Sequence, residues 1–213
     1  IRQSSDNGRP LVEILSDAGV IPGIKVDKST HQLAGSKSEV VTEGLDGLRG
    51  RLAEYYDMGA RFTKWRAVFS ISETTPSDYA ISVNAHALGR YAALAQEAGL
   101  VPIVEPEILM DGSHSIDSCF AASERTLRTV FEELSAQGVA LEGMILKPNM
   151  VISSHESPKR ATSAEVAERS LTCFKRTVPA AVPGIAFLSG GQGDEEATVN
   201  LDAINRLIAD EGA

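Results

Sequence analysis

Short apolar runs, each of which stops at a polar residue, recur along the chain. The runs are VIPGIK, ARFTK, LVPIVE, GMILK and GIAFLS, and their end points are Lys25, Lys64, Glu105, Lys147 and Ser189. Successive end points lie 39 to 42 residues apart. An interval of this length leaves room for one helix between two strands, so we expect each run to be a strand of a repeating strand–helix unit.

Amphipathic segments with readable ends lie between these runs. Thr75 offers a capping hydroxyl before Pro76, which we expect at the first helical position. The stretch TSAE at residues 162–165 has the spacing of a capping box. The expected helices, three of which stop at a glycine, cover about 43–58 before Gly59, 76–98 before Gly99, 115–137 before Gly138, and a stretch from Thr162 onward.

Strands that alternate with helices run parallel, and two parallel architectures compete. One is an open doubly wound sheet and the other is a closed eight-stranded barrel. The GxGxxG fingerprint of dinucleotide-binding doubly wound folds is absent, which favours the barrel. We therefore expect an α/β fold, a (β/α)8 TIM barrel, with residues 1–213 forming a single domain. Eight such units need roughly 330 residues, whereas this chain holds five, so either the barrel continues outside this sequence or the sheet is open.

In a (β/α)8 barrel the active site lies at the carboxyl ends of the strands. The residues expected to converge there are Lys25, Lys64, Glu105, Glu107, Lys147 and Ser189. Glu105 and Glu107 are two positions apart on one extended segment, so both side chains are expected to point into the same mouth. One carboxylate would hold a lysine while the other moves protons.

Lys147 follows an apolar run and precedes Pro148. The simple interpretation is a strand end at which the lysine meets water, since lysine is rarely buried without a partner. The functional interpretation is a desolvated lysine whose free amine attacks a carbonyl carbon. Three lysines gathered in one apolar mouth favour the second, and Lys147 is the best nucleophile among them.

The turn at Ser189, Gly190 and Gly191 precedes acidic residues that open a helix. Its backbone N–H groups and hydroxyl are suited to a phosphate, although such a turn alone is more often plain loop chemistry. A lysine nucleophile, carboxylates and an anion site together describe Schiff-base chemistry on a phosphorylated carbonyl compound.

The composition excludes several classes of protein. The net charge is −9, which argues against nucleic acid as the main partner. No stretch of roughly eighteen apolar residues is present, and no basic segment leads into an apolar one at the N-terminus, so we expect a soluble protein with no membrane partner. Cys119 and Cys173 lack CxxC spacing and are expected to be free thiols in a reducing compartment, as in the cytoplasm.

The histidines do not form a metal-binding pattern. No HxH or HxxxH pair occurs, so we expect no metal and no cofactor. His31, His114 and His155 are expected in loops and His86 in a helix, each satisfied by a partner or facing solvent.

Five motifs follow one another along the chain: GIKVDK, KWR, VPIVEPEIL, LKPNMV and FLSGGQ. With this set, the chain resembles the class I fructose-1,6-bisphosphate aldolases, and the resemblance extends from about Gly8 to Asn205. The resemblance implies a Schiff base at Lys147 and reversible cleavage of fructose 1,6-bisphosphate to dihydroxyacetone phosphate and glyceraldehyde 3-phosphate. It also implies a homotetramer. It implies that Glu105 transfers protons, that Glu107 is a carboxylate beside the nucleophile, and that Lys64 takes part in substrate binding and carbinolamine chemistry. It implies further that Lys25 and Arg66 line the site and that the turn at Ser189, Gly190 and Gly191 holds a phosphate.

By the family pattern the chain covers barrel strands three to seven. The first-strand aspartate, the arginine of an SYGR motif and the C-terminal tyrosine tail are then missing, and we expect a longer aldolase of which this sequence is a portion. Two further hypotheses stay open. One is another imine-forming aldolase that acts on a related phosphorylated ketose, and the other is a non-catalytic binding role of the barrel.

Overall fold

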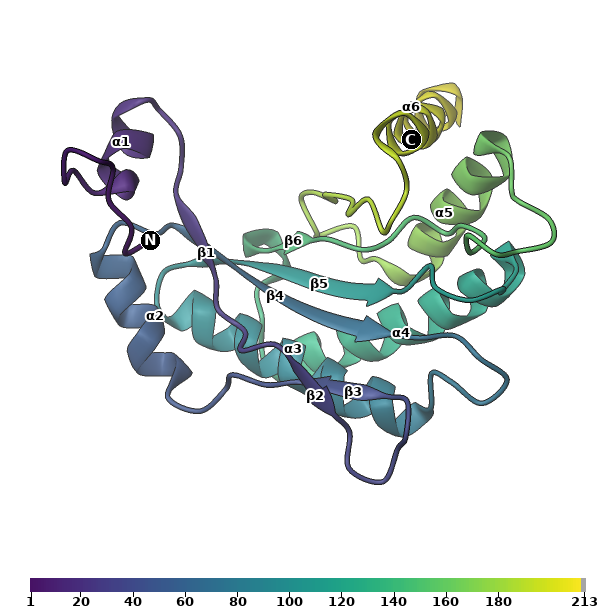
Figure 1. Ribbon diagram of the computed structural model, residues 1–213, viewed down its shortest axis with the longest axis horizontal. Coiled ribbons are helices and arrows are strands. Elements are labelled where there is room, and N and C mark those ends of the chain that lie inside the picture. The colour runs from purple at the N-terminus through teal and green to yellow at the C-terminus, as the bar shows by residue number, and fades with distance from the viewer. Residues whose placement is uncertain (212–213) are drawn as a thin grey trace.

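Strands and helices alternate along the chain in the computed structural model, which describes residues 1–211 (Figure 1). The strands are β1 Gly23–Lys25, β2 Thr30–Gln32, β3 Val40–Thr42, β4 Phe62–Phe69, β5 Val101–Ile108 and β6 Ile145–Leu146. The helices are α1 Leu11–Asp17, α2 Leu48–Asp57, α3 Asp78–Glu97, α4 Ile116–Ala136, α5 Ser163–Thr177 and α6 Asp194–Glu211, with a 3-10 turn at Leu141–Gly143. Within the described part of the chain, none of the helices has the length and apolar character needed to cross a membrane.

Parallel strands form one sheet in the order β1-β4-β5-β6. Residues 184–188 extend it beyond β6, because Leu146 N–H donates to Gly184 O at 3.2 Å and Ala186 N–H donates to Leu146 O at 2.9 Å. Four of the five expected parallel strands are therefore present, and the fifth expected run, GIAFLS, contributes a single parallel bridge at Ile185. Helices α3 and α4 lie side by side on one face of the sheet (Figure 1), which is the arrangement of a barrel wall rather than of a doubly wound sheet.

Two strands are longer than predicted. β4 continues to Phe69 and β5 continues to Ile108, so the prediction that their runs end at Lys64 and Glu105 was wrong. Side chains of β4 alternate strictly between buried and half-buried over the whole strand. A charged residue such as Arg66 does not end a strand when it lies on the face opposite the helix layer.

A short antiparallel hairpin of β2 and β3 lies between β1 and α2 and was not predicted. Asn84 of α3 anchors it: its Oδ1 accepts a hydrogen bond from Thr42 N–H at 3.0 Å, and its Nδ2 donates to Val40 O at 2.9 Å. Each strand has three residues, which is too short for a hydrophobic period to be visible in the sequence. His31, expected in a loop, lies in β2.

The helix ends agree in part with the expected ones. The capping box is confirmed, since Thr162 Oγ1 accepts from Glu165 N–H and Glu165 Oε2 accepts from Thr162 N–H. Helix α3, however, is capped by Ser77, whose hydroxyl accepts from Ala80 N–H, and Thr75-Pro76 precedes it. Helix α2 begins only at Leu48, because the preceding residue, Gly47, has a left-handed backbone.

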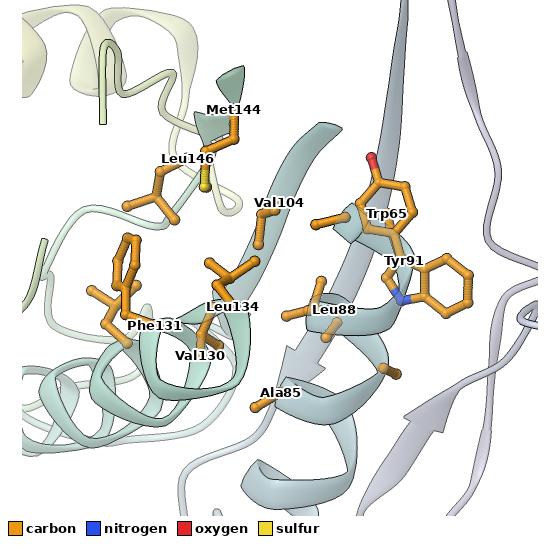
Figure 2. Close-up of a cluster of buried hydrophobic side chains, with 14 of the residues drawn as sticks. Trp65, Ala85, Leu88, Tyr91, Val104, Val130, Phe131, Leu134, Met144 and Leu146 are labelled. Carbon is orange, nitrogen blue, oxygen red and sulfur yellow. The ribbon is translucent and has the colours of Figure 1, made fainter. Parts of the chain in front are cut away.

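A hydrophobic core fills the space between the sheet and its helices (Figure 2). Trp65 of β4 stacks on Tyr91 of α3 with ring centroids 5.5 Å apart, and both are fully buried. Tyr91 Oη lies 2.9 Å from Thr63 Oγ1, which satisfies the buried phenol. Burial raises the pKa of Tyr91 far above its ordinary value. This packing fixes the outward face of β4 and therefore the direction of the side chains on its other face.

Both cysteines are buried free thiols, as expected. Burial raises the pKa of Cys119 to about 11 and that of Cys173 to about 12. Cys119 lies on α4 and Cys173 on α5, within the helix layer of the barrel wall.

Candidate active site

The face of the sheet opposite the helices carries charged side chains on neighbouring strands. In the parallel register Lys25 of β1 is opposite Lys64 of β4, and Arg66 of β4 is opposite Glu105 of β5. Lys64 and Arg66 share one face of β4 because they are two positions apart, while Trp65 between them is buried on the other. The fold therefore brings onto one face residues that are up to 80 positions apart in the sequence.

Glu105 lies at the centre of this face and contacts two lysines. Its Oε1 accepts a hydrogen bond from Lys147 Nζ at 2.8 Å, and its Oε2 is 2.6 Å from Lys64 Nζ. The second contact is an ion pair without hydrogen-bond alignment, which leaves Oε2 without a hydrogen-bond partner. The carboxylate is 4% exposed, whereas the side chains of Lys64 and Lys147 are 22% and 30% exposed. One buried anion thus lies between two cations that keep some access to the inner face of the barrel.

Lys147 is held at its place by the backbone on both sides. Its N–H donates to Val104 O of β5 at 2.8 Å, and the carbonyl of Pro148 accepts from Leu188 N–H at 3.3 Å. The residue follows β6 directly, as predicted, but its side chain is not simply solvated, because it binds Glu105.

Glu107 binds a different cation. Its Oε2 accepts a hydrogen bond from Arg66 Nε at 2.5 Å. This hydrogen bond is the main reason that the pKa of Arg66 is raised above its ordinary value, although partial burial works in the opposite direction. The family resemblance implies that Glu107 lies beside the nucleophile; in the structure the carboxylate that contacts Lys147 is Glu105. Both glutamates do point to the same face, as predicted.

Asp27 binds a predicted site residue and was not itself predicted. Its carboxylate accepts from Lys25 Nζ at 2.5 Å and from Ser29 N–H at 3.2 Å, and its side chain is 2% exposed. Ser29 has a φ of +80°, so the turn it forms is held in a conformation that serine seldom adopts. The available signal was the carboxylate two positions after Lys25 in GIKVDK, since side chains at that spacing lie on one face of an extended segment.

The turn from Ser189 to Gly191 follows the last strand segment of the sheet. Gly190 and Gly191 have φ of +62° and +88°. The buried side chain of Gln192 fixes the turn, since its Nε2 donates to Ser189 O at 2.8 Å while its Oε1 accepts from Asn200 Nδ2 at 2.6 Å. Successive N–H groups at such a turn form a concave site for an anion.

Each histidine has a separate neighbour. His31 lies 3.6 Å from Glu43, His86 is 3.0 Å from Glu133, His114 Nε2 is 3.0 Å from Leu109 O, and His155 is 3.4 Å from Arg160. Among residues 1–211, no three His, Cys, Asp or Glu side chains gather as metal ligands would.

The fold and these contacts define a (β/α)-barrel protein with a carboxylate bound between two lysines on its inner face. A model of the glycolytic family described as "Fructose-bisphosphate aldolase class-I" matches residues 1–211. The chain belongs to the class I fructose-bisphosphate aldolase family. The resemblance stated from the motifs is thereby confirmed.

Individual relatives support the assignment. A probable fructose-bisphosphate aldolase class 1 of Xanthomonas campestris is 56% identical over 207 residues, which are 97% of this chain and 62% of that protein. Cytoplasmic isozyme 2 of fructose-bisphosphate aldolase from Pisum sativum is 54% identical over 205 residues, 96% of this chain and 57% of that one. The chain therefore spans about three fifths of the length of the curated relatives it matches.

A solved structure gives the same result for the fold. Fructose-bisphosphate aldolase from Plasmodium falciparum, crystallised with TRAP and a small-molecule inhibitor, matches with a TM-score of 0.94 and 47% sequence identity. The match covers 97% of this chain and 60% of that chain. The expected fold class, part of a (β/α)8 barrel, is confirmed.

Proposed function

We propose that the protein catalyses the reversible cleavage of fructose 1,6-bisphosphate to dihydroxyacetone phosphate and glyceraldehyde 3-phosphate through an imine at Lys147. The observation that carries the proposal is the contact of Glu105 with both Lys147 and Lys64, at 2.8 and 2.6 Å. A carboxylate in hydrogen-bond contact with an amine is placed to take its proton and to return one later. Membership of the aldolase family supplies the substrate.

The reaction passes through a carbinolamine and an iminium ion at Lys147. The free amine of Lys147 attacks the carbonyl carbon C2 of the open-chain sugar and forms a carbinolamine, which loses water to give an iminium ion. Cleavage of the C3–C4 bond sends its electron pair into the iminium, and the C4 hydroxyl loses its proton to a base. Glyceraldehyde 3-phosphate leaves. The resulting enamine takes a proton at C3, and hydrolysis of the iminium releases dihydroxyacetone phosphate and the amine.

Residues on the inner face of the barrel wall are suited to the separate steps of this reaction. Glu105 transfers protons during imine formation, and Lys64 holds the carboxylate and faces the carbinolamine oxygen. Lys25, Arg66 and the turn at Ser189, Gly190 and Gly191 bind the phosphates as cations and N–H donors. Glu107 keeps Arg66 oriented through its 2.5 Å hydrogen bond. We further propose a cytoplasmic homotetramer, in line with the cytoplasmic isozymes among the relatives and with the family resemblance.

Reductive trapping tests the proposal. The protein is incubated with dihydroxyacetone phosphate, treated with borohydride and digested, and the mass increase is located by peptide mapping. The label is expected on the peptide that contains GMILKPNM and is expected to be absent in Lys147→Met. Lys159→Met is the matched control, since its side chain is 87% exposed and its ion-pair partner is Glu165, which is not a residue of the proposed site. A label on another lysine, or none, contradicts the proposal.

A further inference from the structure

Asn149 lies two residues after Lys147, and its side chain is buried. Its Oδ1 accepts a hydrogen bond from Ile108 N–H at 2.9 Å. Its Nδ2 donates to Met150 O at 3.0 Å and to Ser123 Oγ at 3.2 Å, with Cys119 Sγ at 3.8 Å. One amide therefore joins the end of β5, helix α4 and the segment that carries Lys147.

The backbone hydrogen bonds that join β5 to β6 end at Lys147. The last of them runs from Lys147 N–H to Val104 O. In a parallel strand, the backbone N–H groups that point toward one neighbouring strand belong to every second residue. After Val104, the N–H groups of β5 that would bond to the Lys147 segment are therefore those of residues 106 and 108. Residue 106 is proline and has no N–H. Ile108 N–H bonds to the side chain of Asn149, which takes the place of a backbone carbonyl.

Glu105 lies on the part of β5 that this interruption leaves without regular pairing to the Lys147 segment. It is bracketed by the Val104 hydrogen bond before it and the Asn149 hydrogen bond after it. Ser123 on α4 fixes the amide from behind, so that the orientation of Oδ1 toward Ile108 is determined.

We propose that Asn149 is a positioning residue for Lys147. It fixes the register of the Lys147 segment against β5 and thereby sets the contact between Lys147 Nζ and Glu105 Oε1. The inference rests on the proposed function, since it concerns the rate at which Lys147 forms an imine. A displacement of about 1 Å in such a contact lowers a reaction rate by on the order of 100-fold.

The test measures the rate at which borohydride traps dihydroxyacetone phosphate on Lys147 at increasing concentrations of the ligand. In Asn149→Ala the maximal trapping rate is expected to fall by about 10- to 100-fold. The half-saturating concentration is expected to stay within about threefold of wild type, because the proposed phosphate contacts come from other segments. Ser123→Ala, which removes one support of the amide, is expected to show a smaller fall with the same split.

Asn84 is the matched control. It is also a buried asparagine with hydrogen bonds to backbone groups, but it anchors the β2–β3 hairpin to α3. Asn84→Ala is expected to lower the unfolding temperature to a similar degree and to leave the maximal trapping rate within about threefold of wild type. If Asn149 had only a structural role, Asn149→Ala and Asn84→Ala would change the maximal trapping rate to the same degree.

The outcomes separate the two proposals. If wild-type protein is not labelled at Lys147, the proposed function fails. If wild type is labelled and folded Asn149→Ala is labelled equally fast, or Asn84→Ala slows labelling as much as Asn149→Ala does, the positioning role is overturned. If Asn149→Ala does not fold, Ser123→Ala decides, and a trapping rate equal to that of wild type overturns the role.

Discussion

Lys25 and Lys64 are directly opposite each other in the parallel ladder of β1 and β4, and each binds a different buried carboxylate. Lys25 binds Asp27 on its own segment, and Lys64 binds Glu105 on the next strand. The pairing places two cations side by side without leaving either unpaired, and Lys64 shares its carboxylate with Lys147. The charge on this face is therefore divided into separate ion pairs before any substrate arrives.

Glu105→Gln removes the anion that Lys64 and Lys147 share. The amide still accepts a hydrogen bond but no longer takes a proton from the amine, so imine formation at Lys147 is expected to slow by about 10²- to 10⁴-fold. Single-turnover borohydride trapping measures this rate.

Glu107→Gln is the matched control for that prediction, because it changes the same group two positions further along β5 and leaves the Lys147 contact in place. It is expected to slow trapping much less and to weaken binding of phosphorylated substrate through Arg66. Equal rates for wild type and Glu105→Gln would show that Glu105 does not transfer the proton.

Asp27→Asn releases Lys25 from its ion pair. We expect the substrate concentration at half-maximal rate to rise several-fold while the trapping rate at Lys147 stays near that of wild type, because Asp27 acts on a proposed phosphate contact. The free energy of unfolding is expected to fall by about 1 kcal/mol as the charge-assisted hydrogen bond is weakened. Steady-state kinetics and urea denaturation give the two quantities.

The double variant Asp27→Asn/Lys25→Met checks that the pair is the cause. If Asp27 acts through Lys25, the second substitution adds little to the rise in half-saturating concentration, so the two effects are not additive. Fully additive effects would assign Asp27 a separate role, for example in the turn at Ser29.

Much of this fold was predictable because the apolar runs recur at a constant interval. The parallel strands and the meeting of Lys64, Glu105 and Lys147 follow from that spacing together with the rule that parallel strands end on one side of the sheet. The capping box at Thr162 follows from the TSAE motif. The lengths of β4 and β5 did not follow. A charged residue on the inner face of a strand looks like a strand end when only the sequence is read.

Other features depend on contacts between distant segments and could not be predicted from the sequence. The β2–β3 hairpin is held by Asn84, whose partners in the hairpin are more than 40 positions away. Which glutamate contacts Lys147 depends on the register of β5 against β6 to within one residue pair. Asn149 stood in the motif LKPNMV, yet its hydrogen bond to Ile108 is visible only once the two strands are side by side.

Cys119 and Cys173 give a pH-dependent prediction. Burial raises their pKa values to about 11 and about 12, from an ordinary value of 9.0. As the pH rises above 9 the thiols of the unfolded chain lose protons before those of the folded chain, so the stability they contribute is full below pH 9 and is lost toward pH 11 to 12. Each pKa unit of difference corresponds to about 1.4 kcal/mol.

Urea denaturation at pH 8 and pH 10 measures this loss. Wild type is expected to lose more stability between the two values than Cys119→Ala/Cys173→Ala, in which the thiols are absent and the other titrating groups remain. At pH 8 a thiol-specific reagent is expected to react with the folded protein far more slowly than with the unfolded protein. Rapid reaction in the folded state would contradict the burial of the two thiols.

Gly191→Ala tests the turn proposed to hold a phosphate. A β-carbon at this position would lie 2.9 Å from His155 Nε2, and the backbone has a φ of +88°, which alanine seldom adopts. The turn is therefore expected to open, and the substrate concentration at half-maximal rate is expected to rise by about 10-fold or more, equivalent to about 1.4 kcal/mol of lost binding.

Two causes contribute to this loss in Gly191→Ala, the steric contact with His155 and the backbone conformation, and a second substitution separates them. His155→Ala in the Gly191→Ala background removes the contact but not the strain, so it is expected to restore only part of the binding. Gly193→Ala, where a β-carbon meets open space, is the control and is expected to bind substrate like wild type. Wild-type kinetics in Gly191→Ala would remove the turn from the substrate site.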